Sequence, residues 1–118
     1  MRYMMLIHTP ETAVADAVPA AATAMSADYA AYTQAMIKAG IYKGGDRLQP
    51  AGTAACVRFK DGQTEVLDGP YADSKEQFGG YYEIEVASLE EAVSWAARCP
   101  AAQRGTVEVR QIWEITGR

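Results

Sequence analysis

The chain has 118 residues, a formal net charge of −4 and 22% charged side chains, the composition of an ordinary globular protein. This length predicts a single domain, 1–118, which can bury a core without a metal or a disulfide. The charges form no basic stripe, which speaks against direct nucleic-acid binding. The apolar run near the N-terminus is too short for a signal peptide or a membrane span. We therefore expect a cytoplasmic protein with no membrane partner.

The first half of the chain opens with a strand and a helix. Residues 2–8 form a continuous apolar run that ends at a Thr-Pro pair, which predicts a strand buried on both faces. The Ala- and Pro-rich residues 10–22 predict a loop. Residues 23–39 have the period of a helix and carry one stripe of aromatic and sulfur-containing side chains. The members of this stripe, expected to be core or pocket lining, are Met25, Tyr29, Tyr32 and Met36.

The middle of the chain predicts an irregular crossing, a hairpin and a further strand. Residues 41–53 hold three glycines and one proline, which favours an irregular connection. Residues 54–60 and 64–68 flank an Asp-Gly-Gln turn and are typical of a β-hairpin. Residues 81–86 alternate cleanly between apolar and polar side chains, which predicts a strand with two different faces.

The last quarter predicts a capped helix and a final strand. Ser88 and Glu91 have the spacing of a capping box, which begins a helix that runs to about Arg98. Residues 105–113 alternate again and predict the last strand. The resulting order is β-α-β-β-α-β with one extra strand from the hairpin, an α+β fold of the ferredoxin-like type.

This fold type also predicts a partner. Both helices of a ferredoxin-like unit cover the same face of the sheet, yet residues 3–7 are apolar on both faces of the first strand. The second face therefore needs a cover, and a second copy of the same sheet is the simplest one. We expect a homodimer.

Four segments in the right order carry a family resemblance over nearly the whole chain. They are MRYMMLIH, GGDRLQPAGTA, LDGPYADSKEQFGGYYEIEV and SLEEAVSWAARCPAAQRGTVEVRQI. Together they resemble the DGPF-type branch of the YCII-related family, with Tyr71 where the name-giving motif has Phe. The resemblance implies a dimeric α/β barrel built from ferredoxin-like protomers. It implies no settled activity for this branch.

The resemblance also bears on chemistry. The better-described relatives are proposed to use a His from the first helix and an Asp that follows the second helix. When the helices are aligned on Gly40 and Pro100, these two positions fall on Tyr29 and Cys99. Both members of the proposed pair are absent, which speaks against hydrolase-type chemistry by that pair.

Three candidate pocket residues lie in polar connections. Asp68 precedes a Gly-Pro pair, so its carboxylate either faces a pocket or accepts hydrogen bonds from the backbone of the loop, residues 68–80. Lys75 lies in the same loop and could hold Asp68 ionised or bind an acidic ligand; the alternative is a solvated loop. Asp46 lies in the Gly-rich crossing, where binding residues are often found.

Three further candidates have different origins. Arg47 follows Asp46 and could clamp a carboxylate, although a surface ion pair is the alternative. His8 is the single histidine; the near-neutral pKa of this residue type suits a general base, but a partly buried structural imidazole is the favoured interpretation of its place on the first strand. Tyr29 stands where the relatives have their proposed catalytic His.

The sequence therefore predicts a homodimeric domain with a cleft for an unidentified small molecule, and it leaves open whether the protein is an enzyme. The alternative is a non-catalytic regulatory or interaction module, since similar domains are associated with extracytoplasmic-function sigma factors. A third reading is a domain that only assembles and keeps a vestigial cleft. No cofactor is predicted. No metal site is predicted either, because the two cysteines and the one histidine form no ligand set.

Overall fold

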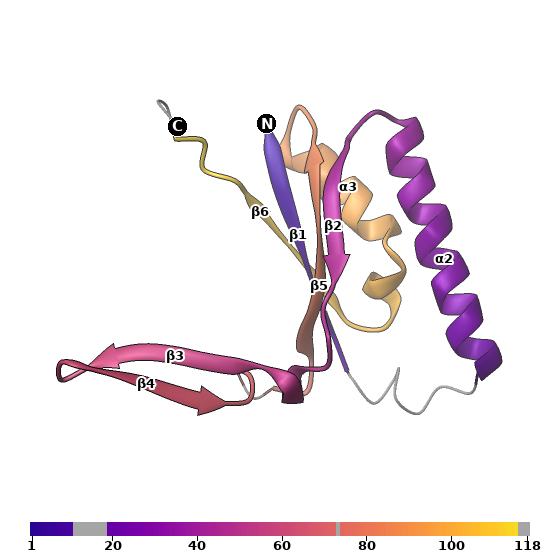
Figure 1. The fold of residues 1–118 in the computed structure, drawn as a ribbon. Helices are drawn as coiled ribbons and strands as arrows, with labels where there is room; N and C mark the ends of the chain where they lie inside the picture. The colour runs from indigo at the N-terminus through magenta and orange to yellow at the C-terminus, as the bar shows by residue number, and fades with distance from the viewer. Residues whose placement is uncertain (11–18, 73, 116–118) are drawn as a thin grey trace.

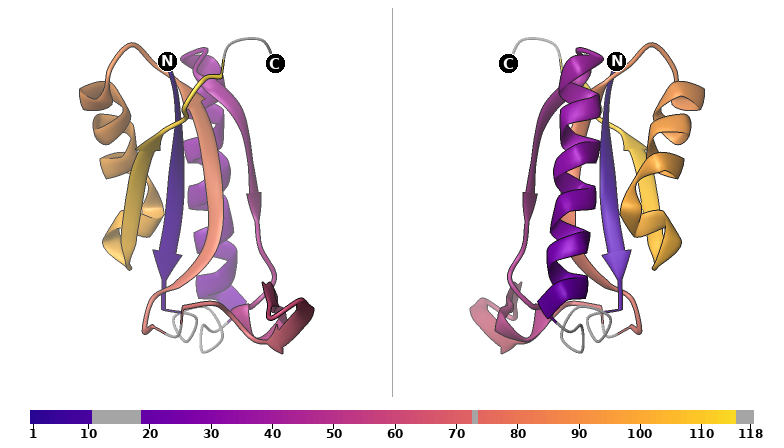
Figure 2. Two further views of the ribbon diagram at one scale, coloured as in Figure 1. Left: turned by 90° about the vertical axis from the view of Figure 1, so that its left-hand side faces the viewer. Right: turned by 90° about the vertical axis from the view of Figure 1, so that its right-hand side faces the viewer.

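The computed structural model describes residues 1–10, 19–72 and 74–115, and of residues 19–25 it describes the backbone alone. In chain order the elements are β1 (Arg2–Thr9), α2 (Pro19–Lys38), β2 (Tyr42–Arg47), the short 3-10 helix η1 (Ala51–Thr53), β3 (Ala55–Lys60), β4 (Gln63–Asp68), β5 (Gln77–Glu85), α3 (Leu89–Arg98), the 3-10 helix η2 (Pro100–Gln103) and β6 (Thr106–Gln111). Four strands form an antiparallel sheet in the order β2-β5-β1-β6, and α2 and α3 cover one of its faces (Figures 1 and 2). This architecture confirms the α+β prediction.

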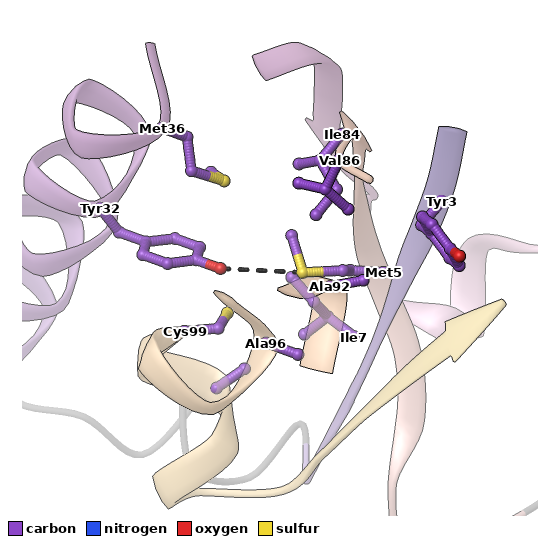
Figure 3. Close-up of a cluster of buried hydrophobic side chains, with 11 residues drawn as sticks. Tyr3, Met5, Ile7, Tyr32, Met36, Ile84, Val86, Ala92, Ala96 and Cys99 are labelled. Atoms are coloured by element: carbon purple, nitrogen blue, oxygen red, sulfur yellow. Dashed lines mark hydrogen bonds between the residues drawn. The ribbon is translucent and has the colours of Figure 1, made fainter. Parts of the chain in front are cut away.

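The core lies between this sheet and the helices. Alternate side chains of β1, from Tyr3 to Ile7, are buried, and Tyr32 and Met36 of α2 pack onto the same cluster (Figure 3). These two residues confirm the predicted helical stripe, whereas the side chain of Met25 lies outside the described residues. Apolar side chains from both layers thus exclude water from one face of the sheet.

The first helix begins earlier than the sequence predicted. α2 starts at Pro19, so residues 19–22 belong to the helix and not to the predicted loop, while residues 11–18 lie outside the described part of the chain. Proline suits the first position of a helix, because its missing N–H would have no partner there and its fixed φ fits the helix. The Ala-rich composition of residues 20–23 is also favourable to helix.

The predicted irregular crossing, residues 41–53, is wrong in its first half. Residues 42–47 form β2, an edge strand that pairs with β5. At Gly45 an added Cβ would lie 2.7 Å from the backbone oxygen of Tyr81 and 2.7 Å from the ring of Tyr82. Gly45, one of the glycines that argued against a strand, is therefore what lets this strand approach its neighbour.

The hairpin is confirmed, but it does not join the main sheet. β3 and β4 pair with each other from Ala55 opposite Asp68 to Lys60 opposite Gln63, and they form a sheet of their own. We call residues 55–68 the arm. It runs away from the main sheet on the side opposite the helices (Figure 1). Apart from the half-buried Cys56, every residue of the arm is exposed.

The polar connection after the arm is shorter than predicted. β5 begins at Gln77, so the two following glycines belong to the strand. The return of the chain is held by main-chain groups, because the N–H of Gly69 donates to the oxygen of Ala54 at 2.7 Å and the N–H of Leu48 donates to the oxygen of Gly79 at 2.8 Å. The first bond closes the base of the hairpin, and the second extends the pairing of β2 with β5.

The second helix agrees closely with its prediction. The hydroxyl oxygen of Ser88 accepts the N–H of Glu91 at 3.2 Å, and the Glu91 carboxylate accepts the N–H of Ala87 at 3.3 Å. This is a capping arrangement that satisfies free donors at the helix start. Pro100 then opens η2. Among the described residues, no helix combines the length and the apolar character needed to cross a lipid bilayer.

Candidate functional site

A groove of about 400 Å³ lies between α2 and the segment that joins α3 to η2. We call it the helix groove. Four of its residues recur on one face of α2, and two of these are alanines, whose short side chains leave the hollow open. The lining consists of Asp28, Ala31, Tyr32, Ala35, Arg98, Pro100, Gln103 and Arg104.

The helix groove carries two positive charges, from Arg98 and Arg104, against one negative charge from Asp28. The guanidinium carbon of Arg98 lies 4.2 Å from the centre of the Trp95 ring, a cation–π contact that orients this side chain. Across residues 1–10, 19–72 and 74–115, neither arginine forms an ion pair with a carboxylate. Two guanidinium groups are therefore available to an anion.

The floor of the groove is Tyr32, a core residue. Its hydroxyl donates to the backbone oxygen of Trp95 at 2.6 Å and lies 3.7 Å from the sulfur of Met5 (the Tyr32–Met5 contact is dashed in Figure 3). Its ring meets the Tyr82 ring edge-on, with 5.6 Å between the centroids. The floor is therefore rigid, because it is held from both helices and from the sheet.

Hydroxyl groups continue from this floor toward β5. The hydroxyl of Thr33 donates to the backbone oxygen of Tyr29 at 2.9 Å, which uses its single proton. The Tyr82 hydroxyl lies 3.1 Å from the same Thr33 oxygen and must therefore be the donor of that bond. Tyr42 packs edge-on against Tyr82. We call Tyr29, Tyr32, Thr33, Tyr42 and Tyr82 the hydroxyl cluster.

The environment keeps these groups protonated at neutral pH. Burial raises the pKa of Tyr29 to about 12, although the nearby guanidinium groups of Arg104 and Arg47 act in the opposite direction. Burial is also the main cause that raises the pKa of three further groups, namely Tyr32, Tyr82 and Cys99. Tyr29, Tyr32 and Tyr82 are therefore phenols and not phenolate bases, and the Cys99 thiol is not a thiolate nucleophile. Tyr32 and Tyr82 already donate to the Trp95 oxygen and to Thr33.

Among the candidates predicted from the sequence, Tyr29 and Arg47 lie on the helix side of the sheet, and the charge of Arg47 has a small effect on the pKa of Tyr29. Tyr29 is half-buried on α2 and packs against the core, and Arg47 at the end of β2 is close enough to act on its pKa. Tyr29 is thus part of the hydroxyl cluster beside the groove. Arg47 is exposed at the end of β2.

His8 and Asp46 lie on the other face of the sheet. His8 shares that face with Met4 and Leu6; its Nε2 is 3.3 Å from the Glu108 carboxylate. The carboxylate of Asp46 accepts a hydrogen bond from the Tyr81 hydroxyl at 3.1 Å. The sheet itself therefore separates these two residues from the helix groove.

Asp68 and Lys75 occupy a third region at the base of the arm. Asp68 ends β4 and is exposed, and Lys75 is exposed in the connection that follows. Within the part of the chain that the structure describes, neither side chain has a hydrogen bond or an ion pair, and the backbone of Gly69 ties the chain instead. The six candidates thus lie in three separate places, and their part in ligand binding stays a prediction.

The residues that line the groove were not singled out from the sequence as a site. Arg98 and Arg104 bracket Pro100, and Asp28 lies one residue before Tyr29 on the helix. Two arginines around a proline that ends a capped helix are the sequence pattern that could have indicated this groove. Among the described residues, no group of three His, Cys, Asp or Glu side chains is placed to hold a metal ion.

Comparisons with known proteins agree with this fold. The model of the YCII-related domain matches residues 1–116. Uncharacterized protein R00369 of Rhizobium meliloti (strain 1021) is 39% identical over 87 residues, which are 72% of this chain and 70% of that protein. The structure of 5-chloro-2-hydroxyhydroquinone dehydrochlorinase (TftG) from Burkholderia phenoliruptrix AC1100, in complex with 2,5-dihydroxybenzoquinone, matches with a TM-score of 0.57 and 16% identity, covering 97% of this chain and 94% of that one. This chain belongs to the YCII-related domain family.

Proposed function

We propose that this protein is a homodimeric binding domain that takes a small aromatic anion in the helix groove. The observation that carries the proposal is the pair Arg98 and Arg104, which has no carboxylate partner among the described residues and borders a groove of about 400 Å³. Pockets of this size suit small organic molecules. Guanidinium groups favour ligands with a carboxylate, because they can donate two parallel hydrogen bonds to it.

The rest of the lining sets the shape of the ligand. Ala31, Ala35 and Pro100 are small apolar groups that fit a flat ring, while Gln103 can both donate and accept a hydrogen bond. The structural neighbour TftG, shown with 2,5-dihydroxybenzoquinone, supports a small oxygenated ring as the class of ligand. Asp28 disfavours a second negative charge at its end of the groove.

The proposal covers binding and not turnover. The phenols of Tyr29, Tyr32 and Tyr82 are protonated at neutral pH, and so is the thiol of Cys99. The hydroxyl protons of Tyr32 and Tyr82 are already donated to the Trp95 oxygen and to Thr33, so Tyr29 is the phenol that can donate to a ligand. Among the described residues that line the groove, Asp28 is the one carboxylate that can accept a proton. A regulatory module that responds to the ligand is therefore as compatible with this site as an enzyme.

The homodimer is supported by the face of the sheet that the helices leave open. Met4 and Leu6 of β1 lie there with Phe78 of β5, and none of the three is fully buried in the single chain. Charged side chains surround them, among them the ion pair of Arg2 with Glu83. An apolar centre with a polar rim is the usual composition of an interface between subunits.

Calorimetric titration with benzoate and ring-substituted benzoates tests the ligand proposal. We expect saturable binding of carboxylates, while benzamide, which has the same ring without the charge, should bind at least about 10-fold more weakly. Arg104→Ala should weaken benzoate binding by about 10- to 100-fold. Arg58→Ala is the matched control, because this arginine lies on the arm. Equal affinities for benzoate and benzamide, or an unchanged Arg104→Ala variant, would rule the proposal out.

A further inference from the structure

The arm is amphipathic. The cross-strand pairs place Val57 opposite Val66 and Phe59 opposite Thr64, so these four side chains share one face of the hairpin. Val57, Phe59 and Val66 on that face are 67%, 75% and 61% exposed. The other face carries Arg58 opposite Glu65 and Lys60 opposite Gln63, and nearer the base it carries Cys56 opposite Leu67, which is 46% exposed. We call Val57, Phe59 and Val66 the apolar stripe.

The described part of the chain gives this stripe no cover. An isolated two-stranded hairpin is marginally stable in water and needs packing against another surface. The arm is closed at its base by the hydrogen bond from the N–H of Gly69 to the oxygen of Ala54, and it leaves the body on the side opposite the helices (Figure 1). A hairpin that is anchored at one end and apolar along its length is suited to contact another molecule.

The total exposed surface area also supports contact with another molecule. The chain exposes 8258 Å², whereas a compact monomer of this mass exposes about 6,300 Å². Its radius of gyration is 16.3 Å, against about 13.5 Å for a compact chain of this length. The excess surface is about twice the ~800 Å² that each partner of a standard interface buries. The chain is therefore more extended than a compact monomer and exposes enough surface to form an interface with another subunit.

The open face of the sheet and the arm lie on the same side of the molecule (Figures 1 and 2). If two copies face each other across a two-fold axis, the open face of each sheet packs against that of the other copy, and the arm of each copy points toward the other copy. Facing sheets are about 10 Å apart, whereas strands of the arm's length extend about 20 Å. An arm in such a dimer must therefore run past the sheet of the other copy and lie along it.

We propose that the arm clasps a second copy of this chain and packs its apolar stripe against the partner's body. This inference rests on the proposed homodimer and adds to it a specific contact that the sheets alone do not need. The partner is a second copy because a single two-fold axis covers the arm and the open face of both copies at the same time. The groove on the helix side stays accessible in this arrangement.

Sedimentation equilibrium over a range of concentrations tests the clasp. Phe59→Lys and Val66→Lys place a charge on the apolar stripe, while Gln63→Lys adds the same charge to the polar face of the arm. We expect a wild-type dimer, an unchanged Gln63→Lys dimer, and self-association at least about 30-fold weaker for Phe59→Lys. Circular dichroism should show that all variants keep their secondary structure.

The outcomes separate the clasp from the dimer and from ligand binding. A dimer whose affinity is the same in wild type, Phe59→Lys and Val66→Lys would overturn the clasp and leave the dimer standing. A monomeric wild type would overturn both. Benzoate binding by the monomeric Phe59→Lys protein tests the groove separately, because the groove lies on α2 and η2, away from the arm.

Discussion

The hydroxyl of Tyr32 donates a hydrogen bond to the backbone oxygen of Trp95 over 2.6 Å, and this bond joins the two helices. The Trp95 oxygen is one of the last carbonyls of α3, where helical partners run out. Cys99, four residues later, donates its N–H to Ala96 instead. Tyr32 thus satisfies a carbonyl at the helix end and holds the floor of the groove in place.

Tyr32→Phe should lower the free energy of unfolding by about 1–3 kcal/mol, because the Trp95 carbonyl is left without its partner in a partly buried place. Urea denaturation monitored by tryptophan fluorescence measures the change. Tyr71→Phe is the matched control, since this ring is 86% exposed. Equal stabilities of the two variants would show that the bond between the helices adds nothing.

Gly105→Ala should also destabilise the fold. An added Cβ at this position would collide with the backbone oxygen of His8 and come within 2.9 Å of the Cα of Thr9, both of which are main-chain atoms that have little room to move. Overpacking of this kind costs about 1–3 kcal/mol. Gly52→Ala is the control, because no atom lies within 4 Å of its added Cβ. Thermal unfolding of both variants compares them directly, and an equal melting temperature would contradict the close packing of β6 on β1.

Stability should fall at alkaline pH because of the buried phenols. Burial raises the pKa of Tyr29 from 10.0 to about 12, so the folded state holds this proton where the unfolded chain releases it. The contribution of this phenol is complete below pH 10.0 and is lost as the pH rises toward about 12. Urea midpoints measured between neutral pH and pH 11 should decline, and more gently in Tyr29→Phe. A Tyr29→Phe protein with the same decline as wild type would contradict this origin.

The two cysteines should differ in reactivity. Cys99 is 1% exposed, and burial raises the pKa of its thiol, so both access and thiolate formation are limited. Cys56 is half-exposed at the base of the arm, where its thiol donates to the oxygen of Gly69 at 3.3 Å. In a Cys56→Ser protein we expect native Cys99 to react with a thiol reagent at least about 100-fold more slowly than in urea. Equal rates in both conditions would show that the core opens readily.

Local pattern alone determined several elements of this protein. The apolar run of residues 2–8 predicted β1, the Ser88 capping box predicted the start of α3, and the turn at Asp61 and Gly62 predicted the hairpin. Each of these elements depends on residues within a few positions of one another, so the local sequence is sufficient to predict it. The same run predicted burial on both faces of β1, whereas in the single chain alternate residues from Tyr3 to Ile7 are buried and the residues between them are only half-buried.

The tertiary structure decided the rest. β2 was missed because Gly44 and Gly45 have a low strand propensity, and at Gly45 only the close approach of β5 makes glycine the residue that fits. The groove was missed for a similar reason. Arg98 and Arg104 line the same groove as Asp28 only because η2 packs against α2, although Asp28 is some 70 positions away in the sequence. Asp68 was predicted from a local turn motif, but its surroundings depend on the tertiary structure. It lies exposed at the base of the arm, and no local sequence pattern specifies the direction in which the arm leaves the sheet.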